Sequence, residues 1–165
     1  MNLSQMFNQE QKKEEKRLDF PLKSFGEKEI RQASPFFLSL ENKGKGRVEI
    51  KGSCVLSFSL LCDRCLTPTE ISLPLSFDRM VYAPGIKVDE EEEGQQFMKD
   101  YELDLEQLLE EELQLLWPTK VLCSEDCRGI CMKCGRNLNE GDCGCDDFVP
   151  DIRFANLMDI FNGKE

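Results

Sequence analysis

Close pairs of cysteines constrain this chain more than any other feature of its sequence. Eight of the nine cysteines fall into four such pairs, and the chain contains no histidine. Zinc prefers tetrahedral thiolate coordination with bonds of about 2.3 Å, and a two-residue spacer lets both sulfurs of a pair reach one ion. The pattern therefore predicts two structural zinc sites with Zn²⁺ as the cofactor of each. The pairs are Cys62 with Cys65, Cys123 with Cys127, Cys131 with Cys134, and Cys143 with Cys145.

Other uses of paired cysteines fit the sequence less well. Disulfides suit a secreted chain, but the segment 1–11 is polar and has no apolar region typical of a signal peptide, which favours a reducing cytoplasm. A thioredoxin-like redox pair would open a helix, whereas Cys62 and Cys65 follow an alternating run typical of a strand. A catalytic zinc needs an open coordination position, which four thiolates do not leave. The ninth cysteine, Cys54, is expected to be a small apolar residue buried in a strand.

The four pairs can be divided between two ions in three ways if every pair stays intact. We favour one site made of Cys62, Cys65, Cys123 and Cys127, which would fasten a hairpin tip to a segment far along the chain. The other site is then Cys131, Cys134, Cys143 and Cys145, which close a short loop as in a small zinc ribbon. A structural zinc ion contributes roughly 10–16 kcal/mol of apparent folding free energy in small peptides, so the C-terminal, cysteine-rich part of the chain should unfold without metal.

The net charge of −11 is concentrated in one part of the chain. Residues 89–118 hold twelve acidic residues and one lysine, whereas residues 1–60 carry an excess of Lys and Arg. Such a chain would be repelled by nucleic acid except at local basic turns, and its acidic segment suits a basic protein partner, although solvated charge alone also explains both features. The candidate partner-binding residues are Glu90, Glu91, Glu92 and Glu93 on the acidic side, and Arg128, Lys133 and Arg136 on the basic side.

The sequence predicts an α+β fold, an antiparallel β meander or partial barrel with an acidic amphipathic helix and a C-terminal zinc-ribbon-like cysteine cluster. Residues 47–60 and 69–82 alternate polar and apolar side chains as half-buried strands do, with the first cysteine pair as a turn between them. Pro74 implies an edge position or a bulge in the second strand. No apolar stretch approaches the ~20 residues of a membrane span, so no membrane partner is expected.

The helix follows from capping and periodicity. Asp104 with Gln107 three residues later resembles a capping box, and Pro118 ends the helix. The leucines that share one helical face are Leu105, Leu108, Leu109, Leu113 and Leu116. The glutamates on its other face are expected to be solvated rather than catalytic. The expected organisation is a polar N-terminal arm (1–30), an antiparallel β region with the first cysteine knuckle (31–88), a flexible acidic loop (89–99), the acidic helix (100–118), and a cysteine-rich zinc-binding region with a closing helix (119–165).

An ordered set of motifs resembles the bacterial YceD family of large ribosomal RNA subunit accumulation proteins. It comprises Cys62-Asp-Arg-Cys-Leu, the acidic helix ending at Pro118, the run from Cys123 to Asn139 with its Gly-Arg-Asn-Leu-Asn sequence, Cys143-Gly-Cys, and Asp151-Ile-Arg-Phe-Ala. The resemblance implies a cytoplasmic, non-enzymatic ribosome biogenesis factor that supports synthesis, processing or accumulation of large-subunit rRNA.

Two function classes follow from these observations. In the first, the protein binds a large-subunit ribosomal protein or a pre-ribosomal particle, with a local rRNA contact as an option and the oligomeric state left open. In the second, the protein is a redox sensor that works through its zinc-bound thiolates, or an interaction protein. The absence of histidine removes Cys-His nucleophilic catalysis, so a hydrolytic enzyme is poorly supported.

Overall fold

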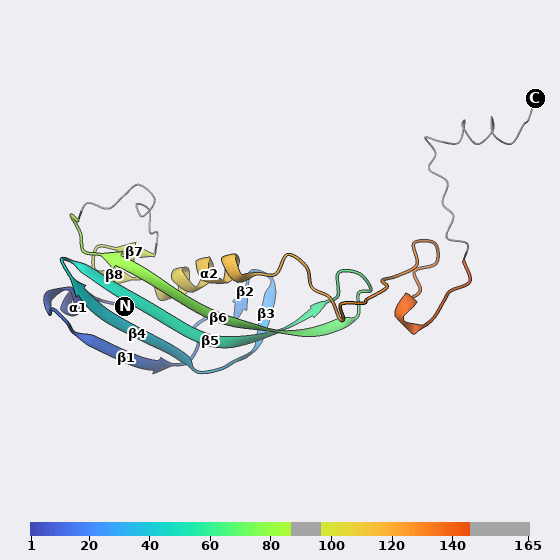
Figure 1. The fold of residues 1–165 in the computed structure, drawn as a ribbon, viewed down its shortest axis with the longest axis horizontal. Coiled ribbons are helices and arrows are strands. Elements are labelled where there is room, and N and C mark those ends of the chain that lie inside the picture. Colours follow the sequence, from blue (N-terminus) through green and yellow to red (C-terminus); the bar gives the residue numbers. More distant parts are fainter. Residues whose placement is uncertain (87–96, 146–165) are drawn as a thin grey trace, which may run out of the picture.

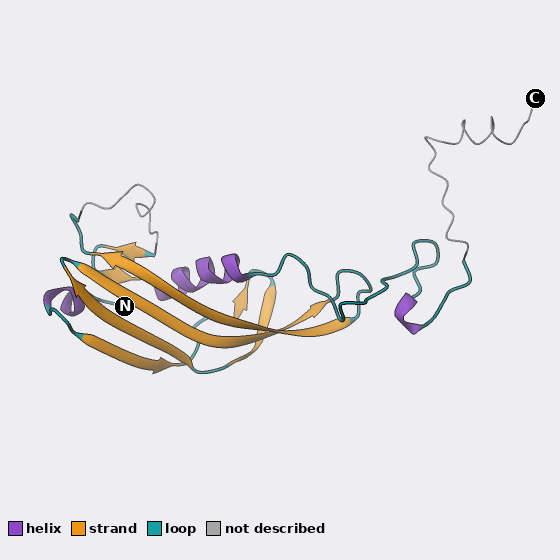
Figure 2. Cartoon of the chain, in the orientation of Figure 1, coloured by secondary structure: helices purple, strands orange, loops and turns teal. Residues whose placement is uncertain are grey.

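A computed structural model describes residues 1–86 and 97–145 of the chain. Most of the described chain is antiparallel β-sheet, with a helix packed on it and the cysteine clusters towards the C-terminal end (Figures 1 and 2). The elements in chain order are α1 (Ser4–Asn8), β1 (Lys13–Leu18), β2 (Ser24–Phe25), β3 (Lys28–Ala33), β4 (Phe36–Gly44), β5 (Arg47–Leu61), β6 (Pro68–Tyr82), β7 (Met98–Lys99), β8 (Glu102–Leu103), α2 (Leu105–Leu116) and the 3₁₀ turn η1 (Leu138–Glu140).

The long hairpin of β5 and β6 is the central element of the fold. The two strands pair in unbroken register from Arg47 opposite Tyr82 to Leu61 opposite Pro68. On the edge of β5 opposite β6, β4 pairs with the first half of β5 and β3 pairs with its second half. Strands β4 and β3 therefore lie one after the other along β5. β1 pairs with β4 and β2 with β3, and every pairing is antiparallel. The hairpin therefore projects its tip away from the rest of the sheet (Figure 1).

One face of the sheet forms the core. Side chains alternate between the faces of a strand, and burial along β5 and β6 alternates accordingly. Gly52 lies on the inner face because a Cβ there would stand 2.3 Å from the ring of Phe77 and 2.9 Å from that of Phe36. The expected alternation in residues 47–60 and 69–82 is thus present. Among the described strands β6 pairs with β5 alone, so Pro74 lies on an edge strand.

Helix α2 covers part of this inner face. Its Asp104 cap accepts a hydrogen bond from the backbone N–H of Gln107 at 3.1 Å, as the capping pattern predicted. The buried side chains are Leu108, Leu109, Leu113 and Glu112. Glu112 is only 8% exposed and accepts a hydrogen bond from Arg79 of β6, so a half-buried ion pair joins the helix to the sheet. The helix begins at residue 105 rather than 100, because a small hairpin of β7 and β8 precedes it.

The N-terminal segment is part of the sheet domain and not a polar arm. Leu3 and Met6 are buried in the core, and β1 extends the sheet beside β4. Asn42 of β4 is 4% exposed, and its amide donates to the carbonyl oxygens of Met6, Phe7 and Gln9, where α1 ends. Charged side chains dominate β1, as is common in edge strands, so the apolar alternation that identifies inner strands is missing there.

Two expectations lie outside the described residues. These are the acidic loop up to residue 96, which includes Glu90 to Glu93, and the closing helix after residue 145. Phe97, at the end of the expected loop, is buried in the core. None of the helices in the described part of the chain is long and apolar enough to cross a membrane.

Candidate metal centres

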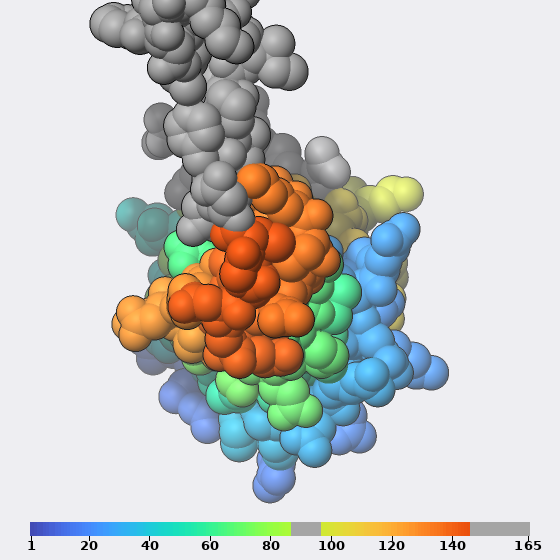
Figure 3. All heavy atoms as spheres, turned by 90° about the vertical axis from the view of Figure 1, so that its right-hand side faces the viewer, coloured from blue at the N-terminus to red at the C-terminus, as the bar shows by residue number. Residues whose placement is uncertain are grey.

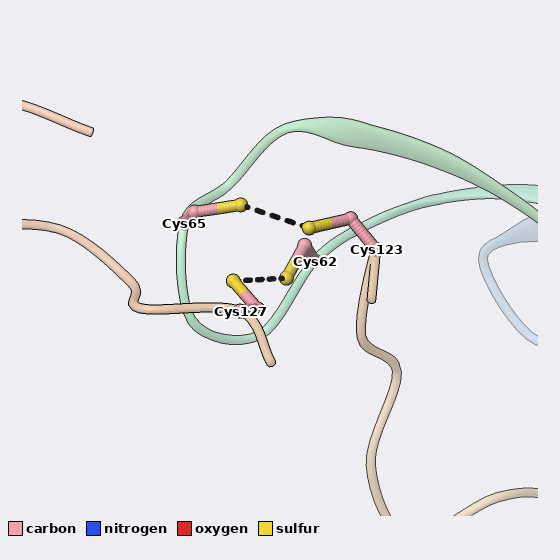
Figure 4. Close-up of side chains that lie close together, drawn as sticks. All are labelled: Cys62, Cys65, Cys123 and Cys127. Atoms are coloured by element: carbon pink, nitrogen blue, oxygen red, sulfur yellow. Dashed lines mark hydrogen bonds between the residues drawn. The ribbon is translucent and has the colours of Figure 1, made fainter. Parts of the chain in front are cut away.

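The first cysteine tetrad joins the tip of the β5–β6 hairpin to the segment that follows α2. Cys62 and Cys65 lie in the turn between the strands, and Cys123 and Cys127 approach from the other segment (Figure 4). The Sγ atoms of Cys62 and Cys127 are 3.7 Å apart, and those of Cys65 and Cys123 are 3.5 Å apart. Three of the four side chains are buried and Cys123 is exposed. Residues separated by about sixty positions in the sequence thus present four thiols to one point.

The turn between Cys62 and Cys65 carries the contacts that hold the two segments together. Asp63 donates its backbone N–H to the carbonyl oxygen of Val121 at 2.8 Å and accepts the N–H of Val121 on its carboxylate at 2.6 Å. The neighbouring Arg64 donates from Nη1 to the carbonyl oxygen of Cys127 at 2.7 Å. These polar contacts join the hairpin tip to the segment after α2 beside the tetrad.

The second tetrad lies beyond the hairpin tip, in the lobe that faces the viewer in Figure 3. It consists of Cys131, Cys134, Cys143 and Cys145. The backbone N–H of Gly135 donates to the carbonyl oxygen of Cys131 at 2.8 Å, which closes a tight turn around the first pair. Gly135 has a φ of 72°, a conformation that glycine adopts without steric cost. The N–H of Lys133 also approaches the sulfur of Cys131 at 3.4 Å.

The donor set and its geometry fit a tetrahedral metal ion. Within each tetrad the four sulfurs lie within 4.8 Å of one another. A tetrahedron with bonds of about 2.3 Å has edges of about 3.8 Å, close to the sulfur separations of 3.5 and 3.7 Å in the first tetrad. A disulfide would bring two sulfurs to about 2.05 Å, and all nine cysteines are free. The structure groups the eight thiols into the same two sets that we favoured from the sequence, and each set could hold a metal ion.

Hydrogen bonding divides the thiols of each tetrad by acidity. Burial raises the pKa of Cys62, but the backbone N–H groups of Cys65, Arg64 and Cys123 outweigh it and lower that pKa to about 6. Backbone N–H groups of the following turn likewise lower the pKa of Cys131 to about 6.

One other thiol of each tetrad behaves in the opposite way. Hydrogen bonds from their own thiols to neighbouring cysteine sulfurs raise the pKa values of Cys123 and Cys145 to about 12. Hydrogen bonding within each tetrad thus favours the thiolate at some positions and the protonated thiol at another, so binding of a cation to all four sulfurs would release protons.

The expected partner-binding residues are only partly brought together. Arg128 forms an ion pair with Asp142 at 2.6 Å. Lys133 and Arg136 are exposed in the segment that carries the second tetrad, residues 128–145, which we call the second lobe. The acidic group Glu90 to Glu93 lies outside the described residues. The ninth cysteine, Cys54, is buried in β5 as expected, and burial raises the pKa of its thiol to about 11.

Sequence reasoning missed the polar residues that surround the first tetrad. Asn139 donates from Nδ2 to the sulfur of Cys127 at 3.4 Å, and Asn137 donates to the hydroxyl oxygen of Thr67 at 3.3 Å. The signal available in the sequence was the Asn-Leu-Asn run. Asparagine commonly caps a turn two residues on, and Asn137 does accept the N–H of Asn139 at 3.0 Å. The sequence does not indicate that this turn lies against the other tetrad.

Fold and site together define a class of protein, an antiparallel β-sheet protein whose longest hairpin carries a four-cysteine cluster with a second one beyond it. The chain belongs to the YceD family, because the model described as "Large ribosomal RNA subunit accumulation protein YceD" matches residues 50–161. The match extends from β5 through α2 and both cysteine tetrads.

The chain is also similar to a curated protein of Mycobacterium leprae (strain TN) named "Uncharacterized protein ML1660". The two are 30% identical over 79 residues, which is 47% of this chain and 36% of that protein, so the match spans little more than a third of the relative's length. No solved structure matches the chain.

Proposed function

We propose that this protein is a non-enzymatic ribosome biogenesis factor that supports the accumulation of large-subunit rRNA. The observation that carries the proposal is the family match over residues 50–161, which contains the hairpin, the helix and both tetrads. Both tetrads offer four thiolates and no open ligand position, which suits structural zinc rather than catalysis. The second tetrad has the short, self-closed ligand spacing of a zinc ribbon. The proposed location is the cytoplasm, where the thiols stay reduced.

The proposed mechanism is electrostatic and works through protein contacts. In helix α2 the buried side chains are Leu108, Leu109, Glu112 and Leu113, whereas Glu106 and Glu110 are exposed, so the helix presents acidic side chains on its outer face. With the acidic run at Glu90–Glu93, this face suits a basic large-subunit ribosomal protein or a pre-ribosomal particle. Lys133 and Arg136, exposed in the second lobe, would supply any local rRNA contact.

A pull-down with the zinc-loaded full-length protein tests this function. Lysate from its own cells is divided into untreated and ribonuclease-treated halves, and the bound proteins and RNA are identified. We expect basic large-subunit proteins to remain bound after ribonuclease treatment. Recovery of no large-subunit protein and no large-subunit precursor RNA would contradict the proposed function. Large-subunit RNA whose protein contacts vanish with ribonuclease would contradict the protein-contact mechanism alone.

A pair of charge variants tests which surface is used. The acidic variant replaces Glu106, Glu110 and the run Glu90–Glu93 by Gln, and the matched basic variant replaces Lys133 and Arg136 by Gln. We expect the acidic variant to lose the partner at low salt while the basic variant keeps it. Low salt is the informative condition because attraction between exposed charges is strongest where salt screens it least. An acidic variant with wild-type binding at both low and high salt would refute the role of these carboxylates.

A further inference from the structure

The loop between the two cysteine pairs of the second tetrad reaches back to the first tetrad. Residues 135–142 lie between Cys134 and Cys143 and include the turn η1. From this loop Asn139 donates to the sulfur of Cys127 at 3.4 Å. Since Cys127 belongs to the first tetrad, the ligand loop of one candidate metal centre supplies a hydrogen-bond donor to a sulfur of the other.

A second contact from the same loop reaches the opposite side of the first tetrad. Asn137 donates from Nδ2 to the hydroxyl oxygen of Thr67 at 3.3 Å. The Cys65 thiol donates to that oxygen at 3.2 Å, and once Cys65 is a thiolate the hydroxyl can reverse this bond and donate to the sulfur while it accepts from Asn137. The loop therefore acts on a sulfur from each of the two segments that form the first tetrad.

The two asparagines are held by polar contacts. Asn139 accepts the backbone N–H of Arg128 at 2.7 Å, and the N–H of Leu138 donates to the carbonyl oxygen of Gly129 at 2.8 Å. None of the side chains at 135–142 is buried, so apolar packing within the described chain contributes little to the loop's position. The strongest constraint available is the flanking pair of cysteines, because an ion bound to all four thiols of the second tetrad fixes both ends of the loop.

We propose that the second tetrad is a clasp that keeps Asn137 and Asn139 against the sulfurs of the first, so that metal bound at the second centre strengthens metal binding at the first. Hydrogen bonds from residues around a metal site orient its ligands and stabilise their charge, and their removal typically costs 10- to 100-fold in metal affinity. The two centres then lose zinc in a fixed order. The second centre, which is the more exposed of the two, releases its ion first, and the zinc affinity of the first centre falls when the loop 135–142 moves away from its sulfurs.

Zinc release to a colorimetric chelator in excess, with full-length protein, tests the order. We expect the wild type to release two zinc ions per chain in a fast and a slow step. Asn139→Ala should accelerate the slow step by about 10-fold or more and leave the fast step unchanged. Glu140→Gln is the matched control, because Glu140 neighbours Asn139 in the exposed turn and its side chain makes no contact with either tetrad in the described chain. It should release zinc as the wild type does.

A variant without the second centre completes the test. Cys143→Ser with Cys145→Ser should bind one zinc ion and release it about 10- to 100-fold faster than the slow wild-type step. Adding Asn139→Ala to that variant should change the rate of zinc release from the first centre less than twofold, because the loop 135–142 no longer contacts that centre. This non-additivity would show that the second centre acts on the first through Asn139. The proposal is overturned if the remaining ion leaves at the slow wild-type rate, if Asn139→Ala alone leaves the slow step unchanged, or if the wild type binds fewer than two zinc ions.

Discussion

Replacing Asn42 by alanine tests the structural role of the N-terminal segment. The amide of Asn42 donates to the carbonyl oxygens of Met6 at 2.6 Å, Gln9 at 3.0 Å and Phe7 at 3.3 Å, and its oxygen accepts the N–H of Gly44 at 2.6 Å. Only the bond to Met6 is fully buried, so its loss should cost about 2 kcal/mol, and the partly exposed groups about 1 kcal/mol together, because water can replace those bonds. Asn42→Ala should therefore lower the free energy of unfolding by about 3 kcal/mol.

Urea unfolding at fixed pH and zinc concentration measures this loss. Asn8→Ala is the control, since Asn8 is exposed at the end of the same helix and should change stability by no more than about 0.5 kcal/mol. A loss below 1 kcal/mol for Asn42→Ala, or equal losses for the two variants, would refute the inference that this amide fastens α1 to the sheet.

Three further substitutions test the packing of the sheet and the helix. Glu112→Gln should lower the free energy of unfolding by about 1–3 kcal/mol, because it breaks the half-buried ion pair of the buried Glu112 with Arg79, whereas the exposed Glu110→Gln should lower it by at most about 0.5 kcal/mol; equal losses would contradict the assigned faces of α2. Gly52→Ala should lower the melting temperature sharply through its clash with buried phenylalanine rings, whereas Ser53→Ala on the exposed face should not; a wild-type melt for Gly52→Ala would contradict the register of β5. Burial raises the pKa of Cys54 from 9.0 to about 11, so its contribution to stability is complete below pH 9 and is lost as the pH rises through 11. The free energy of unfolding relative to Cys54→Ala should then fall by about 2–3 kcal/mol between pH 8 and pH 11, and a difference that does not change with pH would refute the effect.

The grouping of the cysteines was accessible from the sequence because its logic is local. Two alternating runs with a turn at Cys62 and Cys65 predict a hairpin whose tip carries that pair, and the short spacing from Cys131 to Cys145 favours a self-closed set. Only one pair then remains to join the hairpin tip. The grouping in the structure agrees with this argument, which needed no knowledge of the overall topology.

Features set by distant partners were not accessible. Glu112 looks like the glutamates beside it, and its burial depends on Arg79 of a strand that no local pattern connects to the helix. Residues 13–18 lack the apolar alternation that identifies a strand, because β1 lies at the sheet edge. Asn139 belongs to a turn that could be predicted, but its contact with Cys127 depends on how the second lobe lies against the first tetrad.

X-ray absorption at the zinc edge of the purified full-length protein, combined with its metal content, tests the central claim most directly. The two tetrads could each hold a metal ion, and we predict two zinc ions per chain, each with four sulfur ligands at about 2.3 Å and no oxygen or nitrogen in the coordination shell. One ion per chain, a shell that includes water or carboxylate oxygen, or thiols paired as disulfides would contradict the account of two closed four-thiolate centres.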